Sequence, residues 1–233
     1  MKRSIPLSLL FLFIAPVAYS QTTPSVSPDE ILKQMRDAYR TCSSYSDTGE
    51  VRTLFIQSNG KRTNAKPFKT AFVRGSGFRY EFKDKFGADD WRIYIVSQLG
   101  FDIQSWWTIR PQVAKFETLG QAIAGAVGVS GGSAAVVPFM LLPEMGRGSR
   151  FTHPADLKLL GEEVLDGRTA YKIEFRGYKD RTVTIWIDKS SSLLLKMFET
   201  AEFDTFKSES TTTYSPQINV KIEQEQLAFN PPG

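Results

Sequence analysis

The chain has almost none of the side chains that hold metal ions or form disulfides. Its 233 residues include one cysteine, Cys42, and one histidine, His153. A single cysteine excludes an internal disulfide, and a zinc site needs several cysteine or histidine ligands. We therefore expect neither a metal nor a cofactor. Cys42 shares a helical face with Ile31, Met35 and Ala38, which predicts a packed apolar position for its side chain.

An excess of charge of one sign is also missing. Removing Lys2 and Arg3, which belong to a leader described below, from the 29 basic residues leaves 27 basic against 25 acidic residues. This balance argues against a nucleic-acid-binding surface and against a polybasic membrane patch. The sequence also lacks the glycine patterns that cradle phosphates or dinucleotides. We expect no nucleic-acid partner.

Long apolar runs occur at two places, and the first is the N-terminus. Lys2 and Arg3 precede an almost wholly apolar run at 5–17, and the small residues Ala18 and Ser20 follow it. This order is typical of a secretory signal peptide. An uncleaved membrane anchor is the less favoured alternative, because the run is shorter than the ~20 residues that span a bilayer.

The leader divides the chain into three parts. The sequence predicts a signal peptide at 1–20, with cleavage near Ser20-Gln21, and a short polar linker at 21–26. The remaining residues, 27–233, are enough for one domain with a sizeable core.

The second apolar run is internal and contains no charged residue. It is the segment 118–143, TLGQAIAGAVGVSGGSAAVVPFMLLP, and charged residues crowd both sides of it. Although it is long enough to span a bilayer, its five glycines and Pro138 disfavour a membrane helix. Divided at Gly131-Gly132, it has the apolar spacing of two short helices.

An apolar helix pair must lie against an equally apolar surface, and two interpretations are open. The first is a buried helical hairpin in an ordinary core. The second is a movable lid or plug over a hydrophobic cavity, with Gly128, Gly131 and Gly132 as its hinge. The lid residues that would contact a ligand are Leu119, Ile123, Val127, Val136, Phe139, Met140 and Leu142.

Most of the remaining chain alternates apolar and polar residues with a period of two. The clearest case is Phe78, Tyr80 and Phe82, which alternate with charged residues. A helix start precedes the strands, with Ser27 as N-cap. The pattern predicts an α+β fold. In it a strongly curved antiparallel sheet forms an unclosed (half) β-barrel with helices on the concave face.

Several segments carry a family resemblance. They are SYSDTGEV at 44–51, SGFRYEF at 76–82, GVSGG at 128–132, LLGEEVLDGRTAYKIEF at 159–175, TIWIDKSSSLLLK at 184–196, and the ending TTYSPQINVKI followed by FNPP. In this order they resemble the periplasmic lipoprotein-carrier superfamily of LolA-, LolB- and RseB-like proteins. They are most similar to a branch of periplasmic proteins of unsettled function.

The resemblance implies a half-barrel in the periplasm that encloses an acyl chain or another hydrophobic ligand. A monomeric carrier of this kind would exchange its ligand, for example a lipoprotein, with a membrane-associated donor or acceptor. The density of aromatic residues is consistent with a cavity wall. The predicted wall residues are Phe68, Phe72, Phe78, Tyr80, Phe82, Trp91, Ile93 and Trp106.

One motif is similar to a catalytic one. Residues 128–132 fit the G-x-S-x-G pattern of a hydrolase nucleophile elbow, with Ser130 as nucleophile. That elbow requires a strand before the serine, whereas an alanine-rich helical run precedes Ser130. We therefore expect a protein that is not an enzyme. The main alternative to a carrier is a ligand-free interaction or sensor module, and a Ser130 esterase is the remote one.

Overall fold

The alternating segments form strands of one antiparallel sheet. The computed structural model describes residues 26–86, 90–145, 151, 154–177 and 181–232, so the predicted leader, most of the linker and His153 lie outside the described part. The strands of the first half are β1 (Ser44–Gln57), β2 (Gly60–Val73), β3 (Gly77–Phe86), β4 (Asp90–Leu99), β5 (Asp102–Trp107) and β6 (Arg110–Lys115). Those of the second half are β7 (Ala155–Leu165), β8 (Arg168–Arg176), β9 (Thr182–Asp188), β10 (Leu194–Glu202), β11 (Phe206–Tyr214) and β12 (Gln217–Ile218).

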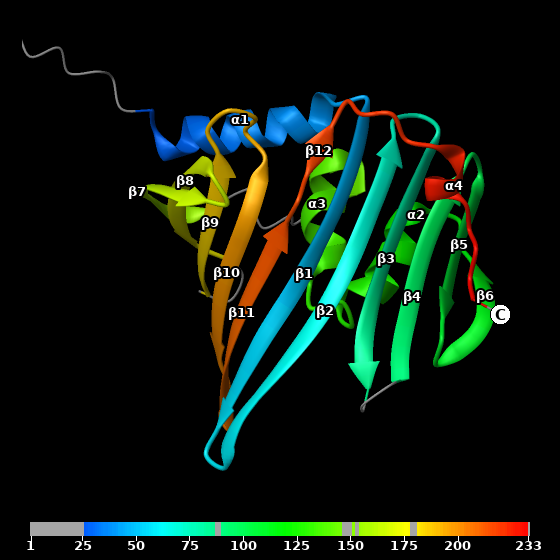
Figure 1. Cartoon of the computed structure of the whole chain (residues 1–233), viewed down its shortest axis with the longest axis horizontal. Coiled ribbons are helices and arrows are strands. Elements are labelled where there is room, and N and C mark those ends of the chain that lie inside the picture. The colour runs from blue at the N-terminus through cyan, green and yellow to red at the C-terminus, as the bar shows by residue number, and fades with distance from the viewer. Residues whose placement is uncertain (1–25, 87–89, 146–150, 152–153, 178–180, 233) are drawn as a thin grey trace, which may run out of the picture.

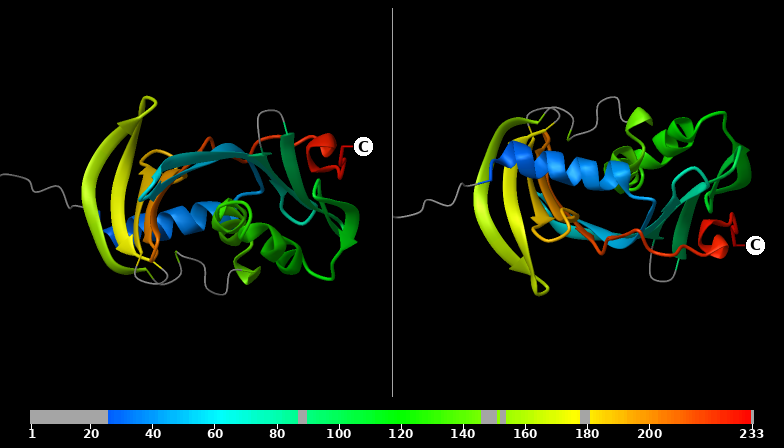
Figure 2. Two further views of the ribbon diagram at one scale, coloured as in Figure 1. Left: turned by 90° about the horizontal axis from the view of Figure 1, so that it is seen from below. Right: turned by 90° about the horizontal axis from the view of Figure 1, so that it is seen from above.

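The sheet is open at both ends. In the described residues the strand order is β6-β5-β4-β3-β2-β1-β11-β10-β9-β8-β7, and β12 pairs with the start of β1. The long strands β1 and β11 pair over Gly49–Gln57 and Phe206–Tyr214 and so join the two halves. The views along the strands show a strongly curved sheet that does not close on itself (Figure 2). The predicted α+β half-barrel is confirmed.

The helices are α1 (Pro28–Thr41), α2 (Leu119–Val127), α3 (Ser133–Leu141) and the short α4 (Gln224–Leu227), with a 3-10 turn η1 (Pro143–Met145) after α3. The predicted start of α1 is confirmed, because the Ser27 side chain accepts a hydrogen bond from the Glu30 N–H. No helix in the described ranges is both long enough and apolar enough to cross a membrane.

Helices α1, α2 and α3 cover the concave face of the sheet (Figures 1 and 2). Helix α1 packs beside α3 and β7, while α2 contacts α3, β4 and β5. Their buried side chains belong to one cluster with those of the strands, and this cluster is the main core. The prediction that the apolar insert fills the hollow of the sheet is therefore correct in its placement.

The register of β1, β2 and β3 arranges concave-face side chains in three cross-strand rows. The outer row is Tyr45, Phe72 and Phe78, the middle row is Asp47, Thr70 and Tyr80, and the inner row is Gly49, Phe68 and Phe82. Two aromatic rows therefore enclose a row made of a carboxyl and two hydroxyl groups.

The C-terminal segment crosses the convex face, which the sequence pattern did not predict. The Ser97 hydroxyl, on β4, donates to the Leu227 carbonyl at 3.0 Å, and Arg79 donates to the Ala228 carbonyl. Near the start of β1, the Ser44 hydroxyl donates to the Val220 carbonyl at 2.6 Å. Residues 220–228 thus cover part of the convex face, which the alternation of apolar and polar residues in the strands would leave exposed to water.

Candidate functional site: the concave face and its mouth

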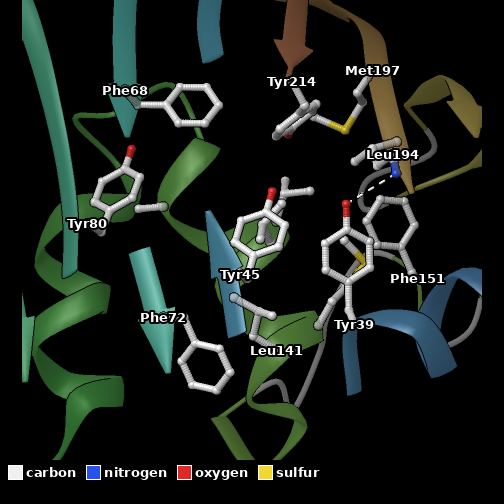
Figure 3. Close-up of a cluster of buried hydrophobic side chains, with 14 of the residues drawn as sticks. Tyr39, Tyr45, Phe68, Phe72, Tyr80, Leu141, Phe151, Leu194, Met197 and Tyr214 are labelled. Atoms are coloured by element: carbon white, nitrogen blue, oxygen red, sulfur yellow. Dashed lines mark hydrogen bonds between the residues drawn. The ribbon is translucent and has the colours of Figure 1, made fainter. Parts of the chain in front are cut away.

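Five of the eight predicted wall residues lie on the concave face. These are Phe68, Phe72, Phe78, Tyr80 and Phe82, and each is at most 3% exposed. They share one cluster with the apolar side chains of α1, α2 and α3, and three of them appear with the centre of that cluster in Figure 3. The wall is therefore already in contact with the helices.

The other three predicted wall residues lie on the opposite face, so this part of the prediction is wrong. Ile95 pairs with Trp106, whereas Tyr94 pairs with Trp107, and it is Tyr94 and Trp107 that contact the main core. Trp91 and Ile93 have the parity of Ile95 and share its convex face. Trp91 is 44% exposed. The aromatic composition of β4 and β5 concealed this parity, because both faces of these strands are apolar.

The seven predicted lid residues differ in how deeply their side chains are buried. Leu119, Ile123, Val136 and Met140 are buried in the main cluster, whereas Val127, Phe139 and Leu142 are half-buried at its margin. All seven contact the core, as both the hairpin and the lid interpretations require.

The joint between α2 and α3 uses two of the three predicted hinge glycines for their backbone freedom. Gly131 and Gly132 have φ of 70° and 90°, which glycine adopts without strain. Gly128 has φ of −67° and needs no such freedom. Two polar contacts hold the joint: Lys66 Nζ donates to the Val129 carbonyl at 2.6 Å, and the Tyr80 and Ser133 hydroxyls are 2.7 Å apart.

Ser130 is part of this joint and is not placed as a nucleophile. It is fully buried, follows helix α2 and not a strand, and its Oγ donates to the Val127 carbonyl at 3.3 Å. The same Oγ accepts the Ala134 N–H at 3.2 Å, as in a capped turn. The G-x-S-x-G match therefore lacks the strand–turn–helix context of a hydrolase elbow. No cluster of three metal-binding side chains occurs among the described residues.

A cleft of about 790 Å³ opens where the concave face meets the end of the helices. Its apolar lining comes from Phe72, Phe78, Ile103, Leu119, Leu142 and Met145. Its rim carries Arg74, Glu117, Thr118 and Glu144, together with the β2–β3 turn. Volume and lining are both in the range of small-molecule sites, and four of the predicted ligand contacts (Phe72, Phe78, Leu119 and Leu142) meet here.

Arg74 joins this rim to two helices. Its guanidinium donates to the carbonyls of Tyr39 (3.1 Å), Cys42 (2.8 Å) and Leu141 (3.2 Å). These carbonyls lie at the C-terminal ends of α1 and α3, where no intrahelical N–H is left to bond them and where a cation is favoured. Arg74 therefore connects the ends of α1 and α3 to the β2–β3 turn.

Asp47 is a buried carboxyl at the centre of the concave face. It is 2% exposed, and its Oδ1 accepts the Ser215 N–H at 2.8 Å. Burial raises the pKa of this carboxyl to about 7, although the Ser215 N–H and the nearby Tyr45 hydroxyl oppose that rise. No hydrogen bond of normal length joins Asp47 Oδ2 or the Tyr45 hydroxyl to another described residue. Asp47 is not among the site residues predicted from the sequence, although its parity with Tyr45 and Val51 on β1 places it on the concave face.

No family model matches the chain, and no curated protein sequence matches it. Three solved structures illustrate the similarities of fold. LppX, a lipoprotein of Mycobacterium tuberculosis, is 15% identical with a TM-score of 0.47, and the match covers 84% of this chain and 97% of LppX.

A chain of the Pseudomonas aeruginosa MucA/MucB complex is 16% identical with a TM-score of 0.46, over 87% of this chain and 61% of that chain. A LolA superfamily protein of Nitrosomonas europaea is 14% identical with a TM-score of 0.33, over 88% and 99%. The superfamily that the sequence resembles is thus among the similar solved structures. Identities and TM-scores this low describe a distant likeness of fold and assign no ligand.

Proposed function

We propose that this chain is a carrier that holds an acyl chain or another hydrophobic ligand between its curved sheet and the helices α2 and α3. The observation that supports this function is the cleft at the mouth, whose lining includes two aromatic residues of the concave face. The cleft carries Phe72 and Phe78 on one side and Leu119 and Leu142 on the other. Lipoproteins or lipids at a membrane are the proposed cargo, and a monomer with one domain at 27–233 is sufficient to hold them.

The energetics suit a carrier that takes up and releases its cargo. Each buried CH₂ contributes about 0.8 kcal/mol, so a 14-carbon chain gains roughly 11 kcal/mol relative to water. A bilayer offers the same chain a similar gain. Transfer is then decided by small differences in how the lid packs on the sheet or on the ligand.

The polar contacts of the two helices differ, and this difference indicates which helix would move when a ligand enters. The α2–α3 joint and the end of α3 are held by Lys66, Tyr80 and Arg74 through polar contacts. The contacts of α2 with β4 and β5 are apolar, apart from the close approach of Gly125 to the Tyr94 hydroxyl. We propose that α2 moves while α3 stays in place, because exchanging one apolar contact for another costs little free energy.

The cleft can be tested with a charge at its rim. In a dye-displacement assay with fatty acids, Leu142→Asp should weaken binding at least about tenfold, because the carboxylate would be desolvated beside the chain. Val164→Asp is the matched control, since Val164 is 66% exposed on the edge strand β7. Binding by Leu142→Asp with wild-type affinity would exclude the cleft as the site. A wild-type protein that displaces no dye and carries no lipid in native mass spectra would favour the ligand-free interaction module.

The proposed location is the periplasm, after removal of residues 1–20. The protein recovered from a periplasmic extract should begin at Gln21, which N-terminal sequencing measures directly. A protein that retains Met1 or remains with the membrane fraction would support the uncleaved anchor.

A further inference from the structure

The middle row of the concave face is polar, and a plain hydrocarbon chain bound beside it could form no hydrogen bonds with it. Asp47, Thr70 and Tyr80 are cross-strand neighbours at 2%, 3% and 0% exposure, between aromatic rows on both sides. The Tyr80 hydroxyl has the Ser133 hydroxyl as its partner. Asp47 is placed differently, because only one of its two carboxyl oxygens has a hydrogen-bond donor of normal length within the described ranges.

The Tyr45 hydroxyl reaches the same level from the outer row. Figure 3 shows the hydroxyls of Tyr39, Tyr45 and Tyr80 all directed away from Phe72 and toward the level of Phe68. The Tyr39 hydroxyl accepts the Leu194 N–H at 3.1 Å. The Tyr45 hydroxyl, though fully buried, makes no hydrogen bond of normal length in the part of the chain that the structure describes, and its polar neighbours at longer range are Asp47 and the Tyr39 hydroxyl.

Asp47 Oδ2 and the Tyr45 hydroxyl require different hydrogen-bond partners. A carboxylate oxygen accepts hydrogen bonds, whereas a tyrosine hydroxyl both donates and accepts. A buried polar atom without a partner costs free energy that a bound partner recovers. An alcohol group, which donates once and accepts twice, can serve Asp47 Oδ2 and the Tyr45 hydroxyl together.

The position of the row along the ligand path determines where that alcohol must lie. Phe72 and Phe78, which line the cleft, belong to the outer row. The middle row is two residues further along each strand, or about 7 Å deeper. A group carried at the head of a fatty acid would stay at the mouth, whereas a group some way down the chain would reach Asp47.

We propose that Asp47 and Tyr45 form a specificity site for an acyl chain that bears a hydroxyl group away from its head. The inference rests on the proposed carrier function, because the chain must enter past Phe72 and Phe78. The aromatic rows contact the hydrocarbon on both sides of the hydroxyl, and the middle row selects the hydroxylated ligand over the plain one.

Oleic acid and ricinoleic acid test this site, because they differ by one mid-chain hydroxyl. The wild-type protein should bind ricinoleic acid about tenfold more tightly than oleic acid, which is the gain expected for one satisfied buried group. Tyr45→Phe removes only an oxygen atom and should reduce the preference to about twofold or less. Asp47→Ala should reduce it in the same way. Isothermal titration calorimetry measures both affinities, and circular dichroism checks that each variant is folded.

Tyr171→Phe is the matched control, since it removes a tyrosine hydroxyl from β8, several strands away from the middle row, and it should keep the preference. Equal affinities of the wild-type protein for the two fatty acids would overturn the inference while leaving the carrier function intact. A preference that survives in Tyr45→Phe and Asp47→Ala would also overturn it. If neither fatty acid binds, the proposed function itself fails, and this outcome is distinct from the others.

Discussion

Asp47→Asn should abolish most of the pH dependence of stability between about pH 5 and about pH 8. In the wild-type protein we expect the free energy of unfolding to fall through this range, by roughly 3 kcal/mol in total. The variant should show a nearly flat profile. Urea unfolding at a series of pH values measures the difference.

Stability falls with rising pH because burial raises the pKa of Asp47. The ordinary pKa of an aspartate is 3.8, and burial raises the pKa of Asp47 to about 7 in the folded protein. Between these values the folded protein holds a proton that the unfolded chain has released, so stability falls as pH rises. Below the lower value both states are protonated and the neutral carboxyl is fully compatible with its surroundings. Above the upper value the fold must bury an ionised carboxylate.

Asp37→Asn provides the control. Asp37 is an exposed partner of Lys33, which lowers the pKa of the Asp37 carboxyl, so its contribution is lost only at acid pH. Asp37→Asn should therefore keep the wild-type slope between about pH 5 and about pH 8. A flat wild-type profile, or a slope that persists in Asp47→Asn, would contradict the assignment to Asp47. The slope is the readout, since the amide can change stability by a constant amount at every pH.

Arg74→Met should destabilise the protein by roughly 3 kcal/mol or more. The change keeps much of the apolar stem and removes donors to the carbonyls of Tyr39, Cys42 and Leu141. Hydrogen bonds from a charged donor contribute about 1.5–3 kcal/mol each, and those of one side chain are not additive. The loss should appear as a lower urea midpoint with an unchanged slope.

Two variants show whether the geometry or the charge of Arg74 is responsible. Arg74→Lys keeps the cation but cannot bond three carbonyls in one plane, so it should lie between wild type and Arg74→Met. Arg52→Met removes an exposed arginine whose hydrogen-bond partner is Glu50, and it should change stability by less than about 0.5 kcal/mol. Arg74→Met with wild-type stability would show that α1 and α3 are held by apolar packing alone.

The sequence was sufficient for the architecture because the signals that determine it are local. The start of α1 at Ser27, the alternation in β3 and the division of the apolar insert at Gly131 all depend on neighbours a few residues apart. The half-barrel was predictable from the length of the sheet and from an uncharged insert that had to be buried somewhere.

The faces of β4 and β5 and the central polar row were not predictable in the same way. In β4 both parities carry apolar residues, so composition gave no sign that Trp91 points away from Tyr94. Asp47 resembles a surface residue in sequence, and its burial becomes evident only from its pairing with Thr70 on β2 and its hydrogen bond to the Ser215 N–H just after β11. Arg74 likewise contacts carbonyls of two helices that the chain brings together only in the folded state.

Because Cys42 is buried, the proposed movement of α2 can be measured by spectroscopy on introduced cysteines. Its thiol is 2% exposed and donates to the Tyr39 carbonyl at 3.2 Å, and burial raises its pKa above the ordinary value. The native thiol should therefore react slowly with labelling reagents. Cysteines introduced at Gln121 on α2 and at Glu225 on α4, both exposed, would take spin labels in the otherwise unaltered protein. Pulsed electron resonance on that pair would report the distance between α2, the helix proposed to move, and α4 on the convex face of the sheet, with and without a fatty acid.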